Sequence, residues 1–228
     1  MYLPTAFAED RLEVKHGLIR AYPLGMLIIP GAAPTADLVP FALYPDEGEV
    51  GLGVLRAHVA RANPAWRALA GGSGECLVVF QGPEAYISPG WYASKAISHK
   101  VVPTWNYAMV QARGVARVVE DAAWLRRQLG DLTAVQENGL PEPWAVSDAP
   151  PDFVNGLLKA IIGIEIPIAS LVGKWKVSQN RGSADAEGVV AGLKARAAAA
   201  GSETPAPDGA AAMAALVAQR IAPDVKPG

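Results

Sequence analysis

A series of short apolar segments, each closed by glycine, proline or aspartate, constrains the fold of this chain most strongly. Segments this short, bounded by turn-forming residues, are typical of an antiparallel β core. Two longer segments follow at residues 100–121 and 164–180, and they predict a long strand or pair of strands and then a late strand. The four short segments read LGMLIIP, DLVPFALYP, EVGLGVLRAH and ECLVVFQGP.

Helical signals accompany these strands. Residues 8–20 fit a short helix that must end before Pro23. Asp121 suits the N-cap of a helix over residues 122–137, and the Pro150–Pro151 pair suits the first turn of another. The order of strands, helices and a late strand predicts an α+β chain with a barrel core rather than a parallel sheet. The expected apolar faces are Trp124, Leu125, Leu129, Leu132 and Val135 in the first of these helices, and Phe153, Val154, Leu157, Leu158 and Ile161 in the second.

The composition of the chain changes near Ala197. The chain has 228 residues, and its length alone gives no reason to split it, so we expect one domain over residues 1–196. Residues 197–228 are rich in alanine, glycine and proline and predict a flexible tail. Within that tail, residues 210–222 could form a short helix with little to pack on.

Composition and residue spacing exclude several classes of protein. A formal charge of −2 provides no overall basic field, so a nucleic-acid surface would be a local patch or belong to a partner. The single cysteine, Cys76, excludes an internal disulfide and is compatible with a reducing cytoplasm. His16, His58 and His99 are widely separated, so no metal site is expected. No apolar segment reaches the ~20 residues that a bilayer requires, and the N-terminus lacks a signal-peptide pattern. We therefore expect a cytoplasmic protein without a membrane partner.

Four segments combine side chains that could bind a ligand. In residues 56–66, His58 and Arg61 would share one face of a short helix and could hold a phosphate, although from spacing alone a solvated basic turn is the simpler interpretation. In residues 173–185, Lys174 and Lys176 flank Trp175, which could suit nucleic acid or an ordinary strand edge.

The other two segments combine aromatic rings with hydrogen-bonding groups. Residues 80–95 alternate aromatic side chains with Gln81, Ser88 and Lys95, and residues 100–114 contain the run Pro-Thr-Trp-Asn-Tyr. Rings beside small polar groups could enclose a flat ligand and bond its edge, but they also fill ordinary interfaces.

Taken in order, several motifs in these segments resemble the PaiB-like family, whose members are described as FMN-binding negative transcriptional regulators. The resemblance covers residues 1–193, departs from the family at Gly90, where serine is expected, and leaves the tail outside it. It rests on HVARANPAW, VVFQGPEAYISPGWY, VVPTWNYAMVQARG and GKWKVSQNRGSAD.

The resemblance implies an antiparallel split β-barrel with peripheral helices, similar to pyridoxamine-phosphate oxidases, that pairs as a homodimer with FMN at the interface. It implies an FMN phosphate near the HVARANP motif and flavin-ring contacts from the motifs that follow. The implied cofactor-binding residues are His58, Arg61, Asn63, Gln81, Ser88, Trp91, Lys95, Thr104, Trp105 and Asn106.

Three functions are compatible with these features. By resemblance, the chain is a homodimeric, FMN-binding repressor that acts on promoter DNA directly, with Lys174 and Lys176 as candidate contacts, or through a partner. Alternatively, a bound flavin would make it an oxidoreductase acting on a small molecule, although no residue stands out as a required acid or base. A third possibility is a protein that binds flavin or haem without turnover.

Overall fold

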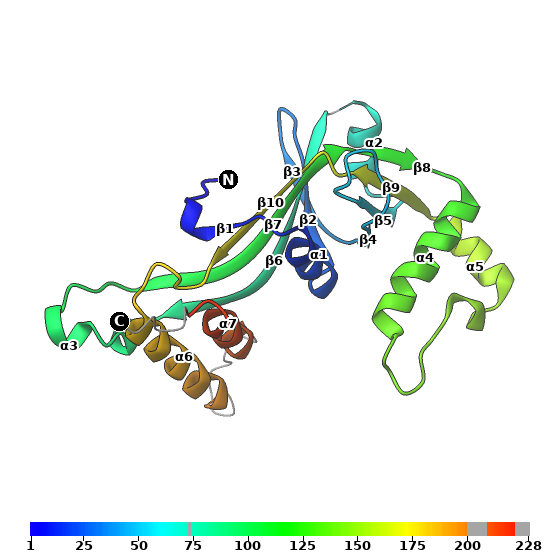
Figure 1. Cartoon of the computed structure of the whole chain (residues 1–228). Coiled ribbons are helices and arrows are strands. Elements are labelled where there is room, and N and C mark those ends of the chain that lie inside the picture. The colour runs from blue at the N-terminus through cyan, green and yellow to red at the C-terminus, as the bar shows by residue number, and fades with distance from the viewer. Residues whose placement is uncertain (73, 200–208, 222–228) are drawn as a thin grey trace. The chain divides into compact units, whose positions relative to one another are not determined.

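The computed structural model describes residues 1–72, 74–199 and 209–221, whose helices and strands are labelled in Figure 1. The chain divides into two compact units. The first consists of Met1–Asp10, Gln81–Met109 and Gly173–Gly228, and the second of Arg11–Phe80 and Val110–Val172. Three strands have residues in both units: β6 (Glu75–Ile87), β7 (Thr104–Val115) and β10 (Ser170–Lys176). No helix in the described ranges is long and apolar enough to span a membrane.

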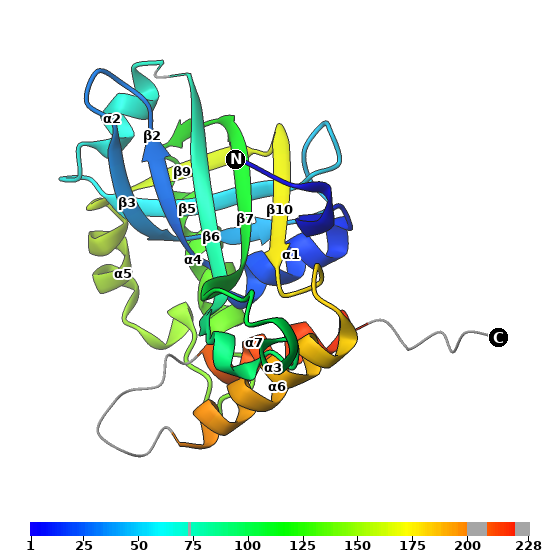
Figure 2. The same cartoon turned by 90° about the vertical axis from the view of Figure 1, so that its left-hand side faces the viewer.

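The strands form two sheets whose registered pairs are antiparallel, as the short apolar segments predict. One sheet has the strand order β1-β10-β7-β6-β2-β3 and the other the order β4-β5-β9-β8. Within the second unit, β5 and β9 run across the direction of β2 (Figure 2). The remaining strands are β1 (Ala8–Glu9), β2 (Leu24–Ile29), β3 (Thr35–Pro40), β4 (Ala42–Tyr44), β5 (Val54–Ala60), β8 (Arg117–Val119) and β9 (Ile161–Pro167).

The core of the second unit is built on β5 and β9, which pair along their whole length, from Val54 opposite Pro167 to Ala60 opposite Ile161. Their inward side chains are aliphatic and almost completely buried, which supplies the main apolar stabilisation of this unit. The Phe41 and Phe80 rings add an edge-to-face contact at 5.8 Å between centroids. The inward aliphatic side chains are Leu55, Ala57, Val59, Ile162, Ile164 and Ile166.

The helices of the second unit follow the predicted helix signals with one change. The first helix begins later than predicted, because Ala8 and Glu9 pair with β10 instead of starting it. Two signals are confirmed: the Asp121 carboxylate accepts a hydrogen bond from the Trp124 N–H at 2.7 Å, and a helix begins at Pro151. These elements are α1 (Leu12–Ala21), α2 (Ala65–Ala70), α4 (Ala122–Glu137), the 3-10 turn η3 (Val146–Asp148) and α5 (Pro151–Leu158).

The predicted apolar faces of α4 and α5 are only partly correct. Leu125 of α4 is buried as expected, but Gln128 is also buried and Val135 is 59% exposed. The reason is that α4 packs on the β5–β9 surface, where Trp124 lies over Gly163 and Gln128 meets a polar side chain of β5. In α5, Val154 and Leu158 are buried, whereas Phe153 and Leu157 are 59% and 51% exposed, and Ile161 belongs to β9.

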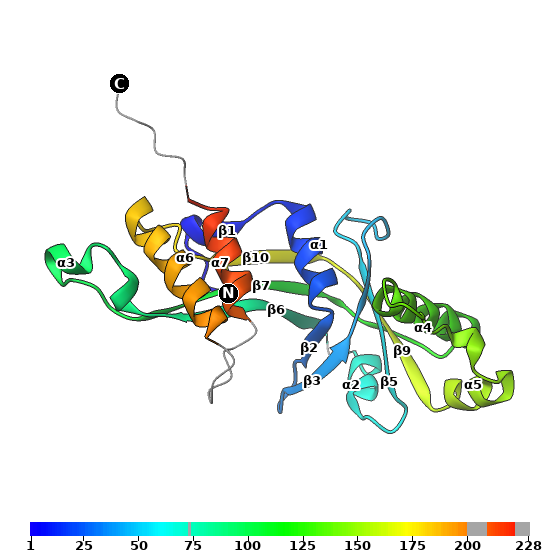
Figure 3. The same ribbon diagram turned by 90° about the horizontal axis from the view of Figure 1, so that it is seen from below.

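The first unit contains the helices of the C-terminal part of the chain. Helices α6 (Ser183–Ala198) and α7 (Gly209–Ala218) lie side by side (Figure 3) and contact each other extensively. Helix α6 was not predicted from the sequence. The smaller elements of this unit are the 3-10 turns η1 (Thr5–Phe7) and η2 (Pro89–Trp91) and the short helix α3 (Lys95–Ser98).

The predicted flexible tail requires a correction. Helix α6 runs to Ala198, beyond the predicted start of the tail. In α7, Met213 and Val217 are 0% and 1% exposed, so the prediction that this helix has little to pack on is wrong for residues 209–218. The short apolar side chains of α7 fit against α6, a contact that composition does not reveal. The rest of the predicted tail, residues 200–208 and 222–228, lies outside the described residues. The domain boundary at residue 196 remains a prediction.

Candidate functional site

In the first unit, three neighbouring strands present aromatic rings and lysines on one face. This aromatic–lysine face consists of Tyr86 on β6, Trp105 and Tyr107 on β7, and Lys174 and Lys176 on β10. The Tyr86 and Trp105 rings meet edge to face at 5.9 Å. The Lys174 ammonium lies 5.3 Å from the centre of the Tyr107 ring. Trp105 is 51% exposed, so its indole offers a surface on which a flat ligand can pack.

Lys176 joins the end of β10 to the start of β7. Its ammonium donates hydrogen bonds to the Thr104 hydroxyl at 2.5 Å and to the Trp105 carbonyl at 2.8 Å. Burial lowers the pKa of Lys176, Tyr107 acts in the opposite direction, and the nearby charges of Lys174 and Arg181 lower this pKa further. An ammonium group has three donors, so one remains available after these two bonds.

Lys174 is the more buried of the two lysines, at 8% exposure. Its ammonium donates to the Tyr2 carbonyl at 3.0 Å and lies 5.7 Å from the centre of the Tyr2 ring. Within the described part of the chain, no carboxylate forms an ion pair with Lys174 or Lys176. Among the described residues, the positive charge of the aromatic–lysine face therefore has no acidic side chain paired with it.

Asn106 was predicted to bond a ligand edge, but its amide is used inside the protein. The side chain is 1% exposed, and its Nδ2 donates to the Ser178 hydroxyl at 2.8 Å. Ser178 is itself buried and has a left-handed backbone, with φ at 64°. Asn106 thus ties β7 to the turn that follows β10 and helps to hold the neighbouring Thr104 and Trp105 in place.

Three further predicted residues of this unit make local contacts. The Gln81 amide donates to the Glu84 carboxylate at 2.5 Å. The Ser88 hydroxyl accepts a hydrogen bond from the Gly90 N–H at 3.1 Å, as expected for a residue that caps a turn. Lys95 is exposed at the start of α3. None of these contacts joins them to the aromatic–lysine face.

Trp91 packs against helix α6 and not on the aromatic–lysine face. A Cβ atom placed on Gly192 of α6 would lie 2.3 Å from the nearest atom of the Trp91 indole, so the ring fills the space that glycine leaves. The predicted ring contact from Trp91 therefore lacks support from its packing, which gives this residue a structural role.

The predicted phosphate residues lie in the second unit. His58 projects from β5, and its Nδ1 is 2.9 Å from the Gln128 side-chain oxygen on α4. The amide nitrogen of Gln128 is buried and has no hydrogen-bond partner among the described residues. Asn63 accepts a hydrogen bond from the Ala65 N–H at 2.8 Å and so supports the start of α2.

Arg61 is already engaged within its own unit. Its Nη1 lies 2.8 Å from the Glu120 carboxylate, and its Nε donates to the Lys159 carbonyl at 3.0 Å. The arginine and glutamate side chains are 41% and 58% exposed, and such exposed pairs contribute only about 0–1 kcal/mol. A phosphate could therefore displace Glu120 at little cost, and the predicted role of Arg61 stays a prediction.

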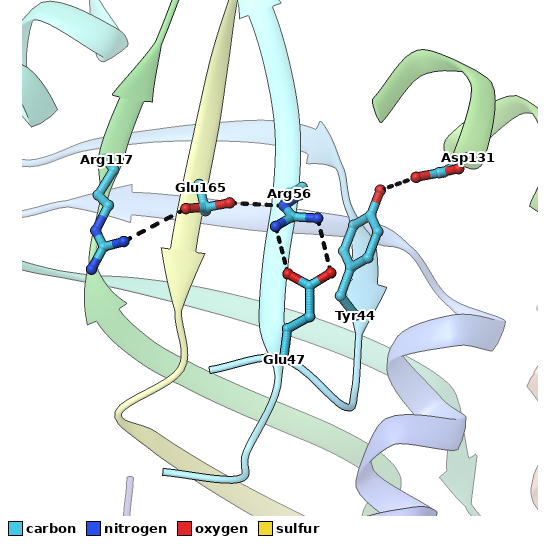
Figure 4. Close-up of polar contacts among 6 residues, drawn as sticks. All are labelled: Tyr44, Glu47, Arg56, Arg117, Asp131 and Glu165. Atoms are coloured by element: carbon cyan, nitrogen blue, oxygen red, sulfur yellow. Dashed lines mark hydrogen bonds and ion pairs between the residues drawn. The ribbon is translucent and has the colours of Figure 1, made fainter. Parts of the chain in front are cut away.

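A row of charged residues, which was not predicted from the sequence, crosses the four-stranded sheet (Figure 4). Arg117 and Arg56 lie opposite Glu165 on its two neighbouring strands. The Arg56 Nε donates to Glu165 at 2.8 Å, and its two terminal nitrogens bond Glu47 at 3.2 and 2.6 Å. These contacts join residues up to 109 positions apart, so no local pattern could have revealed them.

Tyr44 connects this row to α4. Its hydroxyl donates to the Asp131 carboxylate at 2.6 Å, and the Arg56 guanidinium lies 4.2 Å from the centre of its ring. Burial raises the pKa of Tyr44 to about 12, and the bond to Asp131 acts in the same direction. The phenol therefore stays protonated at neutral pH and holds the helix to the sheet.

Comparison with known proteins places the chain among flavin proteins. Residues 1–170 match the family described as "Putative FMN-binding domain". An uncharacterized protein of Emericella nidulans is 38% identical over 85% of this chain and 90% of its own length. The Bacillus subtilis "Protease synthase and sporulation protein PAI 2" is 29% identical over 85% of this chain and 89% of its own length.

A solved structure supports the fold assignment. The flavocytochrome Anf3 from Azotobacter vinelandii superimposes with a TM-score of 0.51 at 16% identity, over 74% of this chain and 69% of its own. The predicted fold class, an α+β chain with an antiparallel split β-barrel, is confirmed. The family match spans residues 1–170, and the Bacillus subtilis PAI 2 protein, or PaiB, aligns over 85% of this chain. This chain therefore belongs to the PaiB-like family of FMN-binding domain proteins.

Proposed function

We propose that the chain binds FMN and acts as a homodimeric regulator of the PaiB-like type in the cytoplasm. The observation that carries the proposal is the aromatic–lysine face, since it combines an exposed indole with ammonium groups that pair with no carboxylate of residues 1–72, 74–199 and 209–221. FMN has a flat ring system with polar edges and a negatively charged phosphate. A surface with rings and positive charge suits both features.

Trp105, Lys176 and Lys174 have distinct tasks in this proposal. The exposed Trp105 indole supplies a packing surface for the flavin ring. Lys176 holds its ammonium against Thr104 and directs its remaining donor at a polar edge of the ligand. Lys174 adds positive charge from a buried position. The bound FMN would supply redox chemistry, which the side chains themselves lack.

The homodimer has support from a separate apolar surface in the second unit. On the β2–β3 pair, Met26 lies opposite Leu38, and these side chains are 42% and 63% exposed, next to Leu24 at 55%. Exposed apolar side chains gathered on one sheet face are typical of an interaction surface. A second copy of the chain, related by a two-fold axis, would cover it.

FMN binding is tested by titrating the protein with FMN and following flavin fluorescence. Lys176→Met should weaken FMN binding about tenfold to a hundredfold, the loss expected for one charge-assisted hydrogen bond. Lys194→Met, at an exposed position on α6, is the matched control and should leave affinity unchanged. Equal affinity in both variants would refute a ligand role for the face.

The regulatory role is tested separately from the cofactor. A gel-shift with promoter DNA, compared with an assay of flavin reduction by NAD(P)H, distinguishes a repressor from an oxidoreductase. Lys174 and Lys176 were candidate DNA contacts, but both ammonium groups are bonded inside the protein. Lost FMN binding with an unchanged gel-shift in Lys176→Met would assign that lysine to the cofactor.

A further inference from the structure

The second unit contains an open pocket of about 460 Å³ that none of the predicted site residues lines. Its floor is the charged row across β8, β9 and β5, formed by Arg117, Glu165 and Arg56 (Figure 4). The loop between β4 and β5 borders it and contributes Glu47 and Glu49. The pocket also has an apolar wall, made of Val50, Val54, Pro167 and Ile168.

The charges that line the pocket do not balance. Arg56 bonds carboxylates on two sides, because its Nε donates to Glu165 and its terminal nitrogens donate to Glu47. The other Glu165 oxygen, Oε1, has Arg117 at 3.8 Å, which is too long for a hydrogen bond. The Arg117 side chain is 67% exposed, so it can turn away at little cost. Glu165, which lines the pocket and is 16% exposed, thus retains an acceptor at Oε1.

Glu49 adds a further negative charge. It is exposed and forms no ion pair within the described part of the chain. Three carboxylates and two guanidinium groups leave the pocket with an excess of one negative charge. Among the described residues, no group of histidine, cysteine or carboxylate side chains is arranged to hold a metal ion. An organic cation therefore fits this lining better than a metal ion or an anion.

We propose that this pocket binds a primary alkylammonium group. The ammonium donates to Glu165 Oε1 and pairs with Glu49, while the alkyl part lies against Val50, Val54 and Ile168. An ammonium carries three donors and no acceptor, which matches carboxylate oxygens. The apolar wall distinguishes an alkylammonium from a small inorganic cation, because burying its methylene groups adds a hydrophobic contribution. This site does not depend on flavin binding.

The experiment uses n-hexylammonium as the probe and the full chain labelled at its valine and isoleucine methyl groups. Titration should shift the resonances of Val50, Val54 and Ile168. Hexanoate and 1-hexanol, which share the alkyl chain, should bind about tenfold more weakly, because they lack the charge-assisted bond.

Two variants and a control decide the outcome. Glu49→Gln should weaken hexylammonium binding several-fold, whereas Arg117→Ala should strengthen it, because it removes a competing cation from Glu165. Glu142→Gln, an exposed glutamate that does not line the pocket, should have no effect. Hexylammonium binding no tighter than 1-hexanol would overturn the proposal. So would hexanoate binding that is lost in Arg117→Ala, since the pocket would then be an anion site.

Discussion

The contact between Trp91 and α6 depends on two glycines one helical turn apart. A Cβ atom on Gly192 would lie 2.3, 2.5 and 2.5 Å from three atoms of the Trp91 indole, and one on Gly188 would lie 2.0 Å from the Trp91 carbonyl oxygen. Gly130, inside the equally long α4, has no atom within 4 Å of the same position. The pair Gly192 and Gly130 therefore allows a controlled test of how tightly α6 packs.

The expected magnitude follows from two opposing terms. Glycine to alanine in a helix interior gains about 0.8–1.0 kcal/mol of helix propensity, and this gain is common to both sites. At Gly192 the indole must move aside, and such overpacking costs about 1–3 kcal/mol. The free energy of unfolding of Gly192→Ala should therefore lie about 1–3 kcal/mol below that of Gly130→Ala, which should be slightly stabilised.

The assay is urea unfolding of both variants, followed by circular dichroism. A lower midpoint with an unchanged m-value would indicate a change in stability alone. Combining Gly192→Ala with Trp91→Ala should remove the overpacking, so that the two substitutions together cost less than the sum of their separate effects. Equal midpoints for Gly192→Ala and Gly130→Ala would refute the packing of Trp91 on α6 and restore it as a candidate ligand contact.

Three further predictions follow from other parts of the structure. Leu38→Asp should convert the proposed homodimer to a monomer in light scattering without lowering the helix content, and a persistent dimer would place the interface elsewhere. If the Arg61 guanidinium holds the phosphate, Arg61→Ala should weaken FMN binding about tenfold to a hundredfold and leave riboflavin binding unaffected. The control is Arg67→Ala, since the Arg67 guanidinium lies over the neighbouring Trp66 ring. Equal losses of affinity for both ligands in Arg61→Ala would exclude the phosphate role. Burial acts to raise the pKa of Asp185, but hydrogen bonds from Ser94 at 2.8 and 2.7 Å leave it lowered. The ionised Asp185 carboxylate therefore stabilises the fold at pH values above its unfolded pKa of about 3.9. Asp185→Asn should lower the melting temperature, and this difference from the unaltered protein should shrink as the pH falls below about 4. A difference that stays constant down to about pH 3 would contradict this prediction.

The sequence by itself determined the local elements and the family. Short apolar segments between glycine and proline became antiparallel strands, Asp121 became a helix cap, and Pro151 began a helix. These signals are local, because they depend on backbone preferences and on residues within a few positions. The ordered motifs identified the family because they extend along most of the chain. Thr104, Trp105, Lys174 and Lys176 were singled out from those motifs, but their mutual contacts were not.

Only the tertiary structure decided which side chains meet and which are buried. Lys174 donates a hydrogen bond to the backbone of Tyr2, 172 positions away, and Arg56 on β5 bonds Glu165 on the neighbouring strand β9. Asn106, which looked available to a ligand, is buried against Ser178. One face of helix α7 is buried, although the sequence predicted little for this segment to pack on. Strand pairing and helix docking bring distant residues together, and a side chain's role depends on the partner it meets there, which no window of sequence contains.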